Sequence, residues 1–374
     1  IGSIGTTSAD GATGAVKIGN TTTNKITLDG TVYNTDSTQA YTAKTGGQYI
    51  EVKPGDDTAM SFISSNDNIT FGTSGVKLFG DTTHTVDTGT GAGAVTFDGA
   101  IESGDGNDND ILVIKSGTGA VTITGAIGGT PGTDTAEPGV IGITKIGNDA
   151  TNDLNFGGAL YSFDGATTVT AKAGDTIDFA ADAEFATLTD SLTFATGTIQ
   201  LEDGVDLTIN SSGGAIAINS VSGTTTGDNF ETITISAGGV NSGTETVSIG
   251  NIGDSGHTQI KTVDITADDG ITLSGAIYTA DSGAQGNVIL RDKVIIDGTV
   301  IIDTDDSLSN DGDITFTDSI EGSSQGAGSL TIEGGTGTIT LTAIGATTGI
   351  GNLSINTQNT GTANLTIKNI GSGT

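Results

Sequence analysis

The sequence predicts an all-β fold, a parallel β-helix or β-solenoid with coils of roughly 20–26 residues. Three observations lead to this prediction. Short runs of alternating apolar and polar residues recur along the chain, and β-branched residues dominate its apolar set. Only three prolines interrupt the 374 residues, which suits continuous strand ladders, and no apolar stripe with helical spacing persists over three turns.

The clearest repeat is the pattern G-x-[VI]-x-[FIL]-x-x-x-[IV]. It occurs at residues 93–101 and again, nearly unchanged, at residues 119–127. Val95 and Val121 occupy matching positions in the two copies. The step between them is typical of proteins in which equivalent strands stack turn upon turn.

Later copies extend the same period. Ile314 and Ile339 occupy matching positions that are separated by almost the same step as Val95 and Val121. Ile271 and Ile314 lie nearly two steps apart, with the apolar run Val294–Ile296 near the middle, which indicates two shorter turns. We therefore interpret residues 1–374 as one continuous solenoid with less regular coils in 1–92 and clearer repeats in 93–374.

Stacking explains why such short strands fold at all. A run of four or five residues has one apolar face and cannot bury it alone. Turns stacked about 4.8 Å apart join these faces into interior columns, while the alternate threonines point outward. Immunoglobulin-like sandwiches and antiparallel barrels are the rival all-β folds, but sandwiches would show a longer repeat.

Composition excludes several classes of protein. The chain has 12 basic and 45 acidic side chains, a net charge of −33 that disfavours binding to nucleic acid. Without cysteine it has no disulfide framework, cysteine-based zinc site or catalytic thiol. No apolar run is long enough for a transmembrane helix. The charge keeps neighbouring molecules apart, and we expect it also to protect the strand edges at the solenoid ends.

Catalytic motifs are not apparent, so the sequence predicts that the protein is not an enzyme. His84 and His257 lie far apart, and both are expected in surface turns. A polysaccharide-active enzyme with paired carboxylates remains an outside alternative. Five tyrosines could stack on sugars, but packing within strands or loops is the favoured reading: Tyr33, Tyr41, Tyr49, Tyr161 and Tyr278.

Two acidic clusters are candidate calcium sites, because Ca²⁺ prefers carboxylate and amide oxygens. The first is Asp105, Asn107, Asp108 and Asp110, in a turn that enters a strand. The second is Asp303, Asp305, Asp306, Asp311 and Asp313, around a loop between two strands. The alternative for each is a solvated acidic turn, so no cofactor is required and Ca²⁺ is the one candidate.

Several segments carry a family resemblance. Residues 300–305, 312–316 and 337–341, together with 28–35, resemble the repeat region of filamentous-haemagglutinin-like large exoproteins. The resemblance implies a right-handed parallel β-helix, secreted by Gram-negative bacteria through an outer-membrane partner. The secretion-recognition domain and signal peptide of such exoproteins are not apparent, so we interpret the chain as an interior or processed segment.

These observations predict an extracellular or cell-surface rod that acts as a bacterial adhesin. Loops near Asp105 and at residues 129–137, together with extended faces, would bind glycans, other cells or copies of the protein. The alternative is a self-assembling structural subunit of an extracellular fibre or sheath.

Overall fold

Parallel strand pairing is the rule throughout the computed structural model, whose strands are mostly three to seven residues long. The structure describes residues 1–5, 14–46, 48–55, 58–104, 110–129, 140–224, 231–239, 245–254, 260–279, 286–305, 311–356 and 364–371. These residues contain no helix. They form two compact units, Ile1–Gly197 and Thr198–Thr374. Together the units contain about 12 solenoid turns, which confirms the predicted fold class.

In the first unit, each turn contributes strands to three parallel ladders. The first ladder contains β1 (Val16–Gly19), β4 (Gln39–Thr42), β7 (Ile69–Phe71), β10 (Val95–Phe97), β13 (Val121–Ile123), β15 (Leu154–Phe156) and β18 (Thr176–Phe179). The second contains β2 (Ile26–Leu28), β5 (Ile50–Val52), β8 (Val76–Leu78) and β11 (Ile101–Ser103), continued through Ile127 to β16 (Leu160–Phe163) and β19 (Ala183–Thr187). The third contains β3 (Val32–Thr35), β6 (Met60–Ser64), β9 (Thr83–Asp87), β12 (Ile111–Lys115), β14 (Thr144–Gly147), β17 (Thr167–Thr170) and β20 (Leu192–Thr196).

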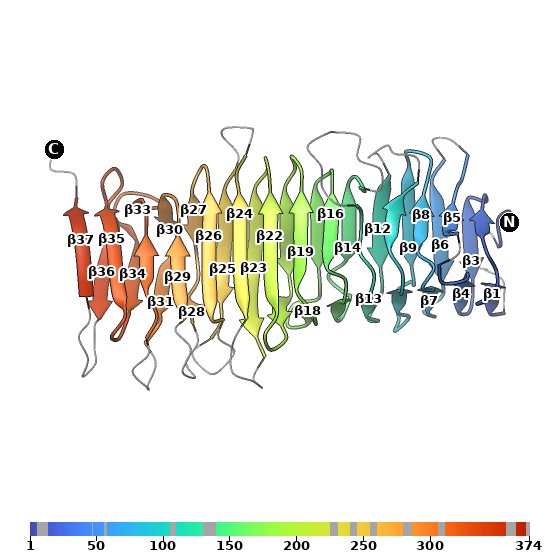
Figure 1. Ribbon diagram of the computed structural model, residues 1–374, viewed down its shortest axis with the longest axis horizontal. Helices are drawn as coiled ribbons and strands as arrows, with labels where there is room; N and C mark the ends of the chain where they lie inside the picture. Colours follow the sequence, from blue (N-terminus) through green and yellow to red (C-terminus); the bar gives the residue numbers. More distant parts are fainter. Residues whose placement is uncertain are drawn as a thin grey trace. The chain divides into compact units, whose positions relative to one another are not determined.

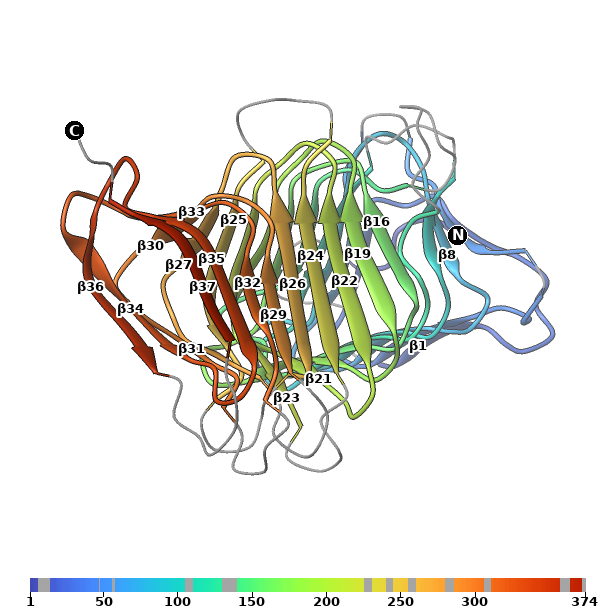
Figure 2. The ribbon, with the colours of Figure 1, turned by 60° about the vertical axis from the view of Figure 1, so that its left-hand side comes forward.

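The second unit repeats the arrangement, with some long strands that bend from one ladder into the next. One ladder contains β21 (Thr198–Leu201), β23 (Ile216–Gly223), β25 (Val247–Ile252), β28 (Ile277–Tyr278), β31 (Thr299–Asp303), β34 (Ala327–Glu333) and β36 (Ile350–Asn356). Another contains β22 (Asp206–Ser211), β24 (Thr232–Ala237), β26 (Thr262–Ala267), β29 (Asn287–Leu290), β32 (Ile314–Phe316), β35 (Thr338–Ile344) and β37 (Asn364–Ile370). β23 and β25 also belong to a third ladder. Its other strands are β27 (Ile271–Leu273), β30 (Val294–Ile296) and β33 (Ser319–Gly322). Figures 1 and 2 show β24, β26 and β29 side by side.

Two predicted matches between turns are confirmed residue by residue. Val95 pairs with Val121, and Ile314 pairs with Ile339. In both cases the partners follow one another by a single turn, with side chains facing the interior. The sequence pattern therefore predicts strand register here as well as fold class.

The predicted relation between Ile271 and Ile314 is wrong. Ile271 does pair with Val294 one turn later, as the spacing indicates. Val294, however, pairs with Ile320, while Ile314 lies in a neighbouring ladder opposite Val288. Strands of different ladders carry the same alternating pattern, so spacing alone does not distinguish them.

Turn length varies more than the sequence predicts. The step from Val16 to its partner Gln39 falls within the predicted range of coil lengths. The step from Val121 to its partner Leu154 exceeds that range. The longer step includes residues 130–139, which lie outside the described residues. The predicted range therefore fits the compact turns and is too short for turns with added loops.

Alternation of buried and outward side chains builds the core. In β24 and β26 the burial alternates at every position, with Ile233, Ile235, Val263 and Ile265 fully buried. Each stacks on its counterpart one turn away. Stacked turns thus convert the apolar face of each short strand into a continuous column of the core.

Aromatic residues gather in two stacks inside the first unit. Phe71 lies between Tyr41 and Phe97, with ring centroids 5.1 and 4.7 Å apart and nearly parallel planes. Further along, Phe156 stacks on Phe179 at 5.2 Å. These offset arrangements follow directly from in-register stacking of equivalent residues, and they strengthen the core beyond simple area burial.

Candidate functional site

The first acidic cluster is only partly described, because Asp105, Asn107 and Asp108 lie outside the described residues. Asp110, its remaining member, is fully buried. Its Oδ1 lies 3.1 Å from Nε2 of His84, and its Oδ2 accepts a hydrogen bond of 3.2 Å from the Ser103 hydroxyl. Asp110 therefore faces the interior, where two side chains hold its carboxylate.

His84 is buried, so its predicted place in a surface turn is wrong. It is 1% exposed and lies in an interior column between Met60 and Leu112, each one turn away. The alternation of β9 places His84 in phase with the buried Val86. This shared alternation with Val86 is the sequence pattern that indicates an inward position for His84. His257 lies outside the described residues.

The three side chains form a polar network in an otherwise apolar interior. Both Ser103 and His84 bond to the carboxylate of Asp110, which stands between them. In a nucleophilic triad the histidine instead accepts the hydroxyl proton. Nδ1 of His84 has no hydrogen-bond partner among the residues the structure describes. The geometry instead fits a structural role. The two hydrogen bonds hold Asp110, at the corner before β12, against His84 of β9 and Ser103 of β11.

The second acidic cluster brings three of its members together, with Asp306 outside the described residues. Oδ1 of Asp303 accepts a hydrogen bond of 2.9 Å from the backbone N–H of Asp305. The carboxylates of Asp305 and Asp311 converge over Gly335, where a Cβ would lie 2.8 and 2.2 Å from their oxygens. Gly335 has a φ of +46°, so both the backbone and the space favour glycine there.

Burial and like charge alter the titration of this cluster. Desolvation is the main cause that raises the pKa of Asp303, and the negative charges of Glu333, Asp305 and Asp311 add to it. Against the lowering effect of the Asp305 N–H bond, the net pKa is about 6. Glu333 lies directly opposite Asp303 in the ladder, where two carboxylates repel each other. The site therefore concentrates negative charge that a proton or a cation would relieve.

Asp313 has a separate role. Its backbone N–H donates to Oδ1 of Asn287 at 2.9 Å, and its own Oδ1 accepts from the backbone N–H of Thr338 at 2.7 Å. These residues occupy three consecutive turns. Asp313 thus links the turns of the ladder that contains β29, β32 and β35.

Metal binding at either cluster stays a prediction. Among the described residues, no group of three or more Asp, Glu, His or Cys has the arrangement of a metal site. The carboxylates of Asp303, Asp305 and Asp311 are nevertheless the oxygen donors that a hard cation such as Ca²⁺ prefers.

The tyrosines divide into two groups. Tyr33, Tyr41 and Tyr161 are fully buried, as the packing interpretation predicts, and burial raises the pKa of each hydroxyl. Tyr49 and Tyr278 are half-buried. Nζ of Lys77 lies 4.3 Å from the centre of the Tyr49 ring, a cation–π contact on the surface.

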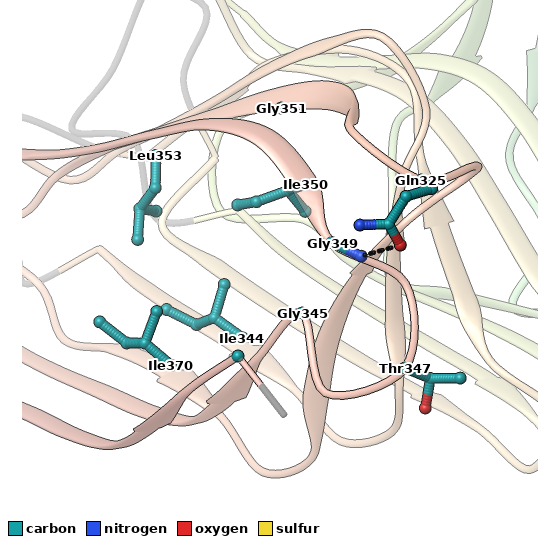
Figure 3. Close-up of a pocket in the computed structure, with 10 residues that line it drawn as sticks. Gln325, Ile344, Gly345, Thr347, Gly349, Ile350, Gly351, Leu353 and Ile370 are labelled. Carbon is teal, nitrogen blue, oxygen red and sulfur yellow. Dashed lines mark hydrogen bonds between the residues drawn. The ribbon is translucent and has the colours of Figure 1, made fainter. Parts of the chain in front are cut away.

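A cavity at the C-terminal end of the second unit was not predicted from the sequence. It encloses about 510 Å³, and Figure 3 shows apolar side chains on both sides of it. Its lining residues come from the last turns: Gln325, Ile344, Gly345, Thr347, Gly349, Ile350, Gly351, Leu353, Ile370 and Gly371. The pattern of β37 resembles that of an interior strand, so sequence alone did not show that it would be exposed.

In comparison with known proteins, the chain matches no family model, no curated protein and no solved structure. Its resemblance to filamentous-haemagglutinin-like exoproteins is therefore supported only at the coarser level of a β-helical repeat architecture. None of the described segments forms a helix with the length and apolar character needed to cross a membrane.

Proposed function

We propose that the protein is an extracellular or cell-surface β-solenoid that acts as a bacterial adhesin. It binds through extended faces and loops and requires no catalytic centre. The observation that carries the proposal is the stacking of parallel strand ladders in each unit, which presents rows of outward polar side chains.

The outward rows give such faces their chemistry. Thr70, Thr96 and Thr122 lie directly opposite one another on three consecutive turns and are half-exposed. Their hydroxyl groups are spaced at the strand separation of about 4.8 Å. A regular row of donors and acceptors suits hydroxyl-rich polysaccharides on a cell surface better than it suits a small ligand.

Charge narrows the ligand class. The net charge of −33 repels acidic polysaccharides and favours neutral or basic ones. The loops expected to display further contacts, near Asp105 and at residues 129–137, lie outside the described residues at 105–109 and 130–137. The family resemblance adds an outer-membrane secretion partner to this proposal.

Binding of the labelled chain to intact bacterial cells, cellulose, dextran and heparin beads tests the proposal. We expect retention on cells and on at least one neutral polysaccharide, and none on heparin. The variant T70V/T96V/T122V removes one hydroxyl row of the first unit while keeping β-branched side chains, and T208V/T234V does the same on the second unit. Each should weaken retention if its row contributes to binding. Failure to bind any cell or polysaccharide would contradict the proposal. Release of reducing ends would favour the polysaccharide-active enzyme instead.

A further inference from the structure

One sheet face of the second unit is rich in exposed hydroxyl groups. It consists of the outward side chains of β22, β24, β26, β29, β32 and β35, which Figure 2 shows side by side. We call it the hydroxyl face. Its threonine and serine side chains are all partly exposed: Thr208, Thr232, Thr234, Ser236, Thr262, Thr266, Thr315, Thr338, Thr340 and Thr342.

The ladder register aligns these side chains across the turns. Thr208 lies opposite Thr234, and Thr315 lies opposite Thr340. Neighbours in such a row are one strand separation of about 4.8 Å apart, and alternate residues of one strand are about 7 Å apart. The hydroxyl face is therefore a two-dimensional array, in contrast to the single row of the first unit.

Most hydroxyl groups of this face take no part in holding the fold together. Thr342 donates to the backbone oxygen of Phe316 at 3.0 Å. Within the described part of the chain, the other hydroxyl groups of the face have no protein hydrogen-bond partner. The buried Thr304, by contrast, donates its hydroxyl to the backbone oxygen of Gly312 at 2.9 Å. The hydroxyl groups of the face are therefore available to a ligand, both as donors and as acceptors.

The hydroxyl face carries little net charge. Asp264 accepts two hydrogen bonds of 2.8 and 2.7 Å from Arg291 on the next turn, so these two charges offset each other. Asp206 and Asp313 lie at one margin of the face, where the strands begin. The acidic cluster around Asp303 belongs to a different ladder. On a chain with a net charge of −33, such a surface suits an uncharged ligand.

The other side chains of the face disfavour a protein or a lipid as the ligand. Among the outward positions of these six described strands, Ile289 is the only large apolar residue, and none is aromatic. Protein interfaces are centred on aromatic and large apolar side chains, and binding to a lipid surface requires apolar area. A neutral polysaccharide instead presents closely spaced hydroxyl groups that can both donate and accept hydrogen bonds.

We propose that the hydroxyl face binds an ordered neutral polysaccharide that contacts several turns at once. The inference rests on the proposed function, because it assigns a ligand class and a face to the adhesive contact. Each hydroxyl contact replaces a hydrogen bond to water and is weak by itself. Contacts on successive turns add up, as in multivalent binding, so a short soluble oligosaccharide spans too few of them to bind.

Depletion of the full chain from solution by crystalline cellulose and by chitin tests the inference. The face variant T234V/T315V/T340V removes three hydroxyl groups and keeps β-branched side chains. The control T272V/T299V/T331V makes the same change at outward positions of the other two ladders of this unit. We expect the wild type and the control to bind at least one polymer. The face variant should bind about tenfold more weakly with an unchanged melting temperature, and excess cellohexaose should not release the wild type.

Equal binding by the face variant and the control would overturn the inference and leave the adhesive function intact. Release by cellohexaose would also overturn it, in favour of a compact sugar site. Retention on intact cells without binding to cellulose or chitin would overturn the inference alone, whereas failure on every surface would contradict the adhesive function as well. A wild-type dimer that the face variant abolishes, measured by sedimentation velocity, would identify a second copy as the occupant instead.

Discussion

Among single residues, Asp303 has the most unusual titration. Its folded pKa is about 6 against 3.8 in the unfolded chain, because burial and three neighbouring carboxylates disfavour its charged form. Between these values the folded state retains a proton that the unfolded state has lost. The resulting stabilisation is fully present below pH 3.8 and is lost as the pH rises through about 6.

Asp303→Asn should therefore stabilise the protein at neutral pH. Asparagine keeps the acceptor for the Asp305 N–H but carries no charge beside Glu333. Because the site is partly exposed, we expect a gain on the order of 1–2 kcal/mol at about pH 7.5 that disappears near pH 4. Urea unfolding at both pH values measures it, with the exposed Asp98→Asn as control. An equal effect at both pH values would contradict the assignment.

Asp110 should matter for a different reason. Asp110→Ala removes the carboxylate that holds Nε2 of the buried His84. An unsatisfied buried donor costs about 1–3 kcal/mol, so we expect a loss of that size in the free energy of unfolding. Asp98→Ala, at an exposed position, should change it by less than about 0.5 kcal/mol. The double variant H84L/D110A should recover part of the loss, and no recovery would argue against this network.

At the scale of single strands, the sequence predicted more than the fold class. The repeat pattern matched Val95 with Val121 and Ile314 with Ile339, and both pairs are neighbours in the ladders. The match succeeds where consecutive turns repeat the same strand pattern. It did not resolve which ladder a strand joins, as Ile271 and Ile314 show.

The candidate site was predictable only in part. The acidic residues are visible in the sequence, but the opposition of Asp303 to Glu333 depends on a register that spans a loop. His84 lies two residues before the buried Val86, so the alternation of β9 indicates an inward position for it. Because histidine is polar, we instead expected it in a surface turn. The exposure of Leu365 and Ile370 could not be predicted, because β37 has the same sequence alternation as β35, with which it pairs.

Close contact between turns makes certain glycines essential. Gly119 lies against Gly93 in the turn below, and a Cβ there would be 2.1 Å from its carbonyl oxygen. Gly119→Ala should therefore destabilise the protein by about 1–3 kcal/mol, as overpacking does elsewhere. Gly55→Ala is the matched control, because its Cβ would meet nothing closer than 3.8 Å. Thermal unfolding compares them, and equal melting temperatures would show that the turns can separate without cost.

For the whole molecule, the distribution of charge predicts a dependence on salt. Residues 81–319 contain 36 acidic and six basic side chains, which repel one another at low ionic strength. Raising NaCl from about 0.01 to 1 M shortens the screening length from about 30 to 3 Å. We expect the melting temperature to rise across this series by several degrees. Sucrose at matched osmolality is the control for general solvent effects, and a flat or falling NaCl series would contradict the prediction.

Calcium should add to this screening if the second acidic cluster binds it. A bound Ca²⁺ would relieve the repulsion among Asp303, Asp305 and Asp311, so the melting temperature should rise more than in NaCl of equal ionic strength. Asp303 must lose its proton to act as a ligand, and its pKa of about 6 means that the calcium effect should fade as the pH drops below 6. Asp305→Asn should weaken it at neutral pH, whereas Asp98→Asn should not. A calcium effect that matches NaCl, or that persists unchanged at pH 4.5, would assign the cluster to a solvated acidic turn, because a site built from these carboxylates has to compete with protons.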